Sequence, residues 1–142
     1  MSKEFDKCLA RGKIKSFSSG PDLVEKELSL AQEDLKLAQE NLAHENFRWG
    51  IVQAYYSMFH TARSLLYSKS YREKSHYCLL EAIKTLFVET GELDEELAKS
   101  FEEAKNLREV ADYYGDFSEI NCKKLLDKAE EFIDETKLIL KK

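Results

Sequence analysis

Helix breakers and cysteines are scarce in this chain of 142 residues. It contains one proline, five glycines and three cysteines, and the cysteines show no C-x-x-C spacing. The odd number and wide dispersal of Cys8, Cys78 and Cys122 predict neither a disulfide framework nor a zinc site. We expect Cys78 and Cys122 to act as small apolar residues on helix faces, the commonest use of free cysteine.

Long apolar runs are absent as well. No segment approaches the roughly 18 apolar residues that a spanning helix needs, and residues 1–6 lack the apolar core of a signal peptide. The chain is 43% hydrophobic and 35% charged, which is typical of a folded soluble domain. These features predict a cytoplasmic protein that makes no use of a membrane. Its net charge of −5 argues against a surface coated with phosphate-binding cations, although a local basic cleft is compatible with it.

Apolar residues recur at helical spacing through most of the chain, whereas strand signals are missing. Between residues 21 and 45 their spacing alternates between four and three, as at Val24, Leu28, Ala31 and Leu35. Similar patterns predict helices over residues 48–69, 75–91, 94–115 and from 118 onward. The last three segments begin with predicted N-caps at Ser75, Asp94 and Ser118. Glycines end two of these helices, at Gly91 and Gly115.

Short connections between long helices make neighbouring helices antiparallel. The chain is therefore predicted to be all-α, an up-and-down bundle of four to five helices. We assign residues 21–142 to this bundle. Residues 1–20, which are rich in basic residues and serine, are predicted to form an N-terminal arm or a short helix.

The predicted second helix carries polar side chains in apolar surroundings. Tyr56, His60 and Arg63 fall at positions i, i+4 and i+7, so one stripe of the helix carries all three. Their donors and acceptors need partners wherever that stripe is covered, which makes the stripe a candidate site. The simpler alternative is an interior His60 bonded to a tyrosine or a carbonyl oxygen, with the nearby aromatic rings in the core or at a dimer surface.

Five segments, in order along nearly the whole chain, resemble those of small prokaryotic HEPN-domain proteins. They are Gly12-Lys13-Ile14, Ala54-Tyr55-Tyr56-Ser57-Met58-Phe59-His60, Lys74-Ser75-His76, Arg108 followed by Ala111-Asp112-Tyr113, and Lys128-Ala129-Glu130-Glu131-Phe132-Ile133. The resemblance implies a helical bundle that usually dimerises and is often encoded beside a minimal nucleotidyltransferase. Some members of the family act as toxins.

Catalytic members of that family are metal-independent RNases that use an arginine followed, after four to six residues, by a histidine. Here Tyr113 stands where the nearest permitted histidine would follow Arg108, and no histidine follows Arg108 anywhere in the sequence. A tyrosine with an ordinary pKa of about 10 is a poor base near pH 7. Arg72 and His76, in a predicted loop and helix start, do not rebuild the motif. We therefore expect the RNase activity to be missing.

The leading interpretation is a dimeric binding or regulatory module, part of a toxin–antitoxin system, that engages a nucleotide, RNA or a nucleotidyltransferase partner without any cofactor or metal. Two alternatives stay open: an RNase toxin with a different base, and a structural helical dimer without a ligand cleft. Arg108 and Asp112, four residues apart, can also form a plain ion pair on a helix surface. The candidate cleft residues are Tyr56, His60, Arg63, Lys74, His76, Arg108, Asp112 and Tyr113.

Overall fold

A computed structural model of the chain describes residues 3–114 and 117–142, with side chains at residues 3–109 and 117–142. Its elements in chain order are α1 (Lys3–Ala10), β1 (Ile14–Ser16), α2 (Gly20–Ala43), α3 (Phe47–Ser68), β2 (Tyr71–Glu73), α4 (His76–Ile83), the π-helical turn η1 (Lys84–Val88), α5 (Glu95–Tyr114) and α6 (Glu119–Leu140).

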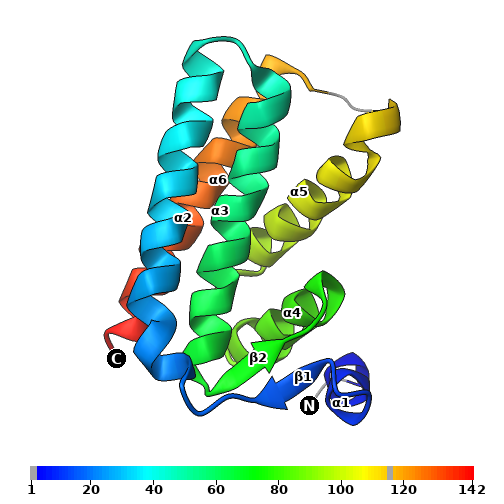
Figure 1. The fold of residues 1–142 in the computed structure, drawn as a ribbon, viewed down its shortest axis with the longest axis vertical. Coiled ribbons are helices and arrows are strands. Elements are labelled where there is room, and N and C mark those ends of the chain that lie inside the picture. The colour runs from blue at the N-terminus through cyan, green and yellow to red at the C-terminus, as the bar shows by residue number, and fades with distance from the viewer. Residues whose placement is uncertain (1–2, 115–116) are drawn as a thin grey trace.

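The predicted all-α fold class is confirmed, and α3 is the centre of the bundle. Figure 1 shows α2 and α3 running antiparallel side by side, with α6 against both of them and α5 and α4 on the other side of α3. The helix α3 contacts α2, α4, α5, α6 and β2, so it is covered from several directions. Within the described residues, no helix is both long and apolar enough to cross a membrane.

Three N-caps predicted from the sequence are confirmed. The Ser75 hydroxyl accepts a hydrogen bond from the Cys78 amide at 3.1 Å, and the Ser118 hydroxyl accepts one from the Asn121 amide at 3.1 Å. The Asp94 carboxylate accepts from the Glu96 amide at 2.9 Å. These bonds satisfy amide groups that the first turn of a helix leaves without an intrahelical partner.

No strands were predicted from the sequence, and this prediction was wrong. β1 and β2 form a two-stranded antiparallel ribbon in which Ile14 pairs with Glu73, Lys15 with Arg72 and Ser16 with Tyr71. Strands of three residues are too short to show the alternation of apolar and polar residues by which a strand is recognised. The ribbon joins the N-terminal segment to the chain that leaves α3.

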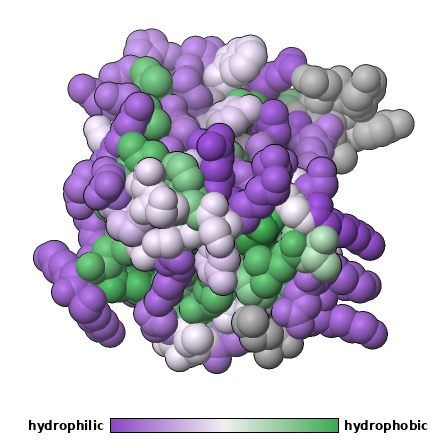
Figure 2. All heavy atoms as spheres, turned by 60° about the horizontal axis from the view of Figure 1, so that its bottom comes forward, coloured by the Kyte–Doolittle hydropathy of each residue, from purple (hydrophilic) through white to green (hydrophobic). Residues whose placement is uncertain are grey.

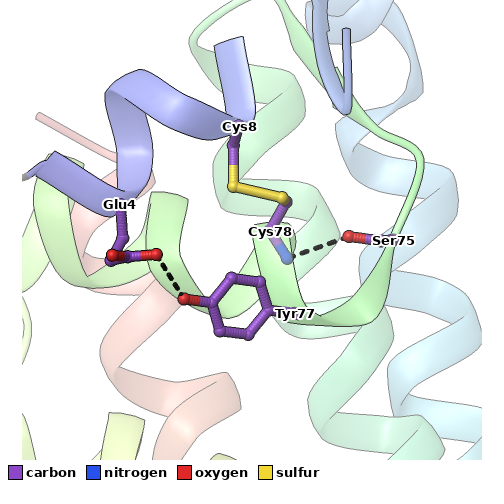
Figure 3. Close-up of a disulfide and its surroundings, with 5 residues drawn as sticks. All are labelled: Glu4, Cys8, Ser75, Tyr77 and Cys78. Carbon is purple, nitrogen blue, oxygen red and sulfur yellow. Dashed lines mark hydrogen bonds between the residues drawn. A yellow bond between two sulfur atoms is a disulfide. The ribbon is translucent and has the colours of Figure 1, made fainter. Parts of the chain in front are cut away.

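The expectation that Cys8 and Cys78 remain unpaired was also wrong. Figure 3 shows a disulfide between Cys8 of α1 and Cys78 of α4, beside a hydrogen bond of 2.7 Å from the Tyr77 hydroxyl to Glu4. The two cysteines are 70 residues apart, so no local spacing reveals their contact. The interpretation of Cys122 is confirmed, because its side chain is fully buried in the core.

We expect this disulfide to contribute to stability, because it restricts the unfolded chain over a long loop. Replacing both cysteines, Cys8→Ser with Cys78→Ser, should lower the free energy of unfolding by about 2–4 kcal/mol. Urea unfolding followed by circular dichroism measures the change. Adding a reductant should lower the stability of the wild type and leave the double variant unaffected. An equal response of both proteins to the reductant would contradict the prediction.

Candidate functional site

Arg108 of α5 lies against two tyrosines of α3. Its guanidinium carbon is 5.3 Å from the centre of the Tyr55 ring and 5.1 Å from the centre of the Tyr56 ring. A cation over an aromatic face is attracted by the electron-rich ring. Tyr55 is fully buried and stacks on Phe101, whose centroid is 5.8 Å away, so the aromatic support under Arg108 belongs to the core.

His76, the first residue of α4, joins the same cluster. Its Nδ1 is hydrogen-bonded to the Tyr55 hydroxyl, and its ring centre lies 4.6 Å from that of Phe59. Burial lowers the pKa of His76, and the charge of Arg108 lowers it further. The imidazole is therefore neutral near pH 7. Burial also raises the pKa of Tyr55, so its hydroxyl keeps its proton.

His60 lies between two carboxylates of α2. Its Nδ1 is 2.6 Å from Glu27 Oε2, and its Nε2 is 3.7 Å from Asp34 Oδ2. The partner of this histidine is thus a carboxylate, whereas the sequence analysis expected a tyrosine or a carbonyl oxygen. Burial raises the pKa of Asp34, and the charge of His60 opposes that shift.

Arg63 completes the polar stripe of α3 with an ion pair to β2. Its Nη2 is 2.9 Å from Glu73 Oε2 and its Nε is 3.2 Å from Glu73 Oε1, a two-point contact that fixes both side chains. Its Nη1 also lies 3.7 Å from Glu27 Oε1. The network Glu27, His60, Arg63 and Glu73 therefore links α2, α3 and β2.

Phe59 connects these two groups of polar side chains. Its ring centre is 5.4 Å from that of His60 and 4.8 Å from the Arg63 guanidinium carbon, in addition to its contact with His76. The predicted candidates Tyr56 and Arg108 are in direct contact, whereas His60 and Arg63 bond to carboxylates of α2 and β2. That Tyr56, His60 and Arg108 share one cleft at a dimer axis stays a prediction.

Other candidates lie apart from this region or beyond what can be described. Lys74 is exposed directly after β2. The side chains of Asp112 and Tyr113 are outside the described residues. Some residues of the site were not singled out from the sequence, because their roles depend on packing between distant elements: Glu27, Asp34, Glu73 and Phe101. A signal existed for Glu27 and Asp34, because a spacing of seven places both on one face of a helix.

A metal-centred site has no support in the described part of the chain. No three His, Cys, Asp or Glu side chains there are grouped so that they could hold a metal ion. The chemistry available to the cluster is that of a guanidinium beside a neutral imidazole and a protonated phenol.

Comparison with known families decides the identity of this fold. The model of the HEPN domain matches residues 24–139. The chain belongs to the HEPN domain family. The resemblance seen in the sequence is thereby confirmed, and Arg108, Tyr55 and His76 all lie within the matched region of this HEPN protein.

Relatives extend the match over most of the chain. A protein of Methanocaldococcus jannaschii named "Putative toxin MJ0142" is 34% identical over 119 residues, which cover 82% of this chain and 81% of that protein. A second from the same organism, "Putative toxin MJ0605", is 29% identical over 119 residues, covering 83% and 89%. A "UPF0332 protein" of Thermotoga maritima is 31% identical over 106 residues, covering 73% and 80%.

The lowered pKa of His76 predicts a pH dependence of stability. The unfolded state takes up the proton near the ordinary histidine pKa of about 6.5, above the pKa in the folded state, so stability falls as the pH drops below that value. His76→Gln removes this titration and should flatten the fall in unfolding free energy between about pH 7 and pH 5. Urea unfolding at several pH values measures the slope. His44→Gln, at an exposed position, is the control; equal slopes for wild type and His76→Gln would refute the prediction.

Proposed function

We propose that this HEPN protein is a dimeric binding or regulatory module of a toxin–antitoxin pair, which engages a nucleotide or a nucleotidyltransferase partner without cleaving RNA. The observation that carries the proposal is the placement of Arg108 on the Tyr55 and Tyr56 rings, five residues before a tyrosine instead of a histidine. The two relatives whose names read "Putative toxin" support the toxin–antitoxin setting.

The chemistry of the cluster favours binding over cleavage. A guanidinium stacked on aromatic rings directs its N–H donors outward along its edge, an arrangement that suits a phosphate group. RNA cleavage needs, in addition, a base that removes the proton of a 2′-hydroxyl near pH 7. The chain has no histidine after Arg108, so α5 and α6 supply no imidazole for this step.

A second candidate function is an RNase in which His76 is the base. Arg72 and His76 do not rebuild the motif in the sequence, but His76 and Arg108 have a common neighbour in Tyr55. A neutral imidazole whose Nδ1–H donates to the Tyr55 oxygen has Nε2 as a proton acceptor. In the opposite tautomer the Tyr55 hydroxyl donates to Nδ1, and Nε2 carries the proton and cannot act as a base.

Cleavage assays separate these two functions. The wild type should not cleave structured or unstructured RNA without metal, because the required base is missing. Tyr113→His should restore cleavage if the rest of the HEPN site is intact, and Tyr113→His with Arg108→Ala should be inactive. Gel analysis of labelled RNA measures the outcome.

Cleavage by the wild type that disappears in Arg108→Ala would show that the proposal is wrong. If that cleavage also disappears in His76→Ala, the second candidate is correct. His44→Ala, at the exposed residue that follows α2, is the matched control for removal of a histidine.

The wide apolar circumference of α3, from which the sequence predicted a dimer, is buried within a single chain. Other apolar side chains remain exposed where α3 and α6 begin, namely Trp49 at 57% and Ile120 at 78%. The Arg48 guanidinium lies 5.6 Å from the Trp49 ring centre and 5.7 Å from that of Phe117, so the start of α3 lies beside the residue that comes two positions before α6.

We therefore expect light scattering to report twice 16.5 kDa at micromolar concentration. Trp49→Lys with Ile120→Lys should give a monomer, because the lysines would place charges in a buried apolar contact. The matched control is Leu138→Lys, at a position 55% exposed near the other end of α6, which should leave the dimer intact. A wild type that is monomeric at every concentration would exclude the dimer.

A further inference from the structure

The ribbon of β1 and β2 carries an unusual arrangement of like charges. Lys15 and Arg72 are directly opposite each other in the ladder. The Lys74 amide donates a hydrogen bond to the Lys13 carbonyl at 2.8 Å, so Lys13 and Lys74 form a second pair of like charges next to the first. All four side chains are exposed, whereas Ile14 and Glu73 between them are buried. Because strand residues alternate between faces, the four cations lie on the same outer face.

This arrangement opposes folding unless an anion is present. Like charges directly opposite each other in a ladder are destabilising. The neighbouring Lys15 ammonium, followed by the charges of Lys13 and Arg72, lowers the pKa of Lys74. The whole chain has a net charge of −5, so this cationic face is a local departure from the average.

The outer face of the ribbon also contains a cleft. A cleft of about 480 Å³ is lined by Lys15, Ser16, Phe17, Arg72, Glu73 and Lys74. The carboxylate among these residues does not neutralise the cations, because Glu73 is turned inward and bound at two points by Arg63, with its side chain only 4% exposed. The Arg72 guanidinium lies 5.5 Å from the Phe17 ring centre, which orients it over the cleft wall.

We infer that the outer face of the β1–β2 ribbon is a binding site for the phosphate groups of a nucleotide, either free or as part of an RNA strand. Arginine binds phosphate at two points, and lysines add charge at short range. Cations two residues apart along a strand are about 6.8 Å from each other, comparable with the distance between consecutive phosphates of a nucleic acid. The cleft also falls within the size range of sites that hold small ligands.

Two other anionic partners fit the surface less well. A lipid bilayer is bound by a broad surface that combines cations with inserted apolar side chains. Figure 2, which brings this end of the molecule forward, shows hydrophilic side chains interleaved with separate apolar ones, without one continuous apolar face. An acidic protein segment would use the lysines, but carboxylates on flexible side chains do not require a cleft beside an oriented guanidinium.

The experiment measures binding of a labelled short single-stranded oligoribonucleotide by fluorescence anisotropy, with ATP as competitor. Lys15→Gln with Lys74→Gln should raise the dissociation constant about tenfold or more, since each charge-assisted contact contributes on that scale. Arg72→Lys keeps the charge but loses two-point binding, and should also weaken it. The control, Lys99→Gln with Lys123→Gln, removes two charges that sit in ion pairs on α5 and α6 and should change the constant by less than about twofold.

The outcomes separate this site from the one proposed around Arg108. Loss of affinity in the ribbon variants supports the inference, whatever the effect of Arg108→Ala. Displacement of the labelled RNA by ATP would indicate a site for a free nucleotide, and no displacement by ATP would indicate a site for an RNA strand. Loss in Arg108→Ala with none in the ribbon variants overturns the inference and leaves the proposed function standing. Absence of RNA and ATP binding overturns it too, as does equal affinity for polyglutamate or phosphatidylserine vesicles. Circular dichroism verifies that each variant is folded.

Discussion

The ion pair between Arg63 and Glu73 determines the arrangement of much that surrounds it. Glu73 is buried on a strand of three residues, and an ionised carboxylate in such a place requires a partner that bonds it at more than one point. Arg63 supplies those bonds from α3. Because the pair faces inward, Arg72 and Lys74 on either side of Glu73 must face outward. One internal interaction thereby fixes the ribbon on the bundle and sets the charge of its outer face.

The central position of α3 explains why the polar side chains are where they are. A helix covered on several sides leaves its polar groups little access to water, and two of its polar side chains, His60 and Arg63, are satisfied by neighbouring elements. α2 supplies Glu27 and Asp34 for His60, and β2 supplies Glu73 for Arg63. Towards α5 and α4, the aromatic ring of Tyr55 contacts the Arg108 guanidinium, and the Tyr55 hydroxyl is hydrogen-bonded to His76. The candidate site is thus built around a core helix and held by contacts from several neighbouring elements.

What could be predicted from the sequence was local. Ser75, Asp94 and Ser118 mark helix starts because a cap involves residues two or three positions apart, and those starts are confirmed. The carboxylate partners of His60 could not be predicted, since they depend on how α2 packs on α3. The link between Cys8 and Cys78 depends on α1 folding back over α4, a contact between distant parts of the chain. Arg108 was singled out from a family pattern, but its aromatic support came only from the packing of α5 on α3.

The Cys8–Cys78 bond has a topological consequence. It closes a covalent ring that contains α2 and α3, whereas α5 and α6 lie on a linear tail outside that ring. A force applied to the two chain ends passes from residue 8 to residue 78 through the sulfur atoms and bypasses α2 and α3. A processive unfolding machine that starts at the C-terminus would first unwind α6 and α5. It would then meet a closed loop that can enter a narrow pore only as at least two strands at once.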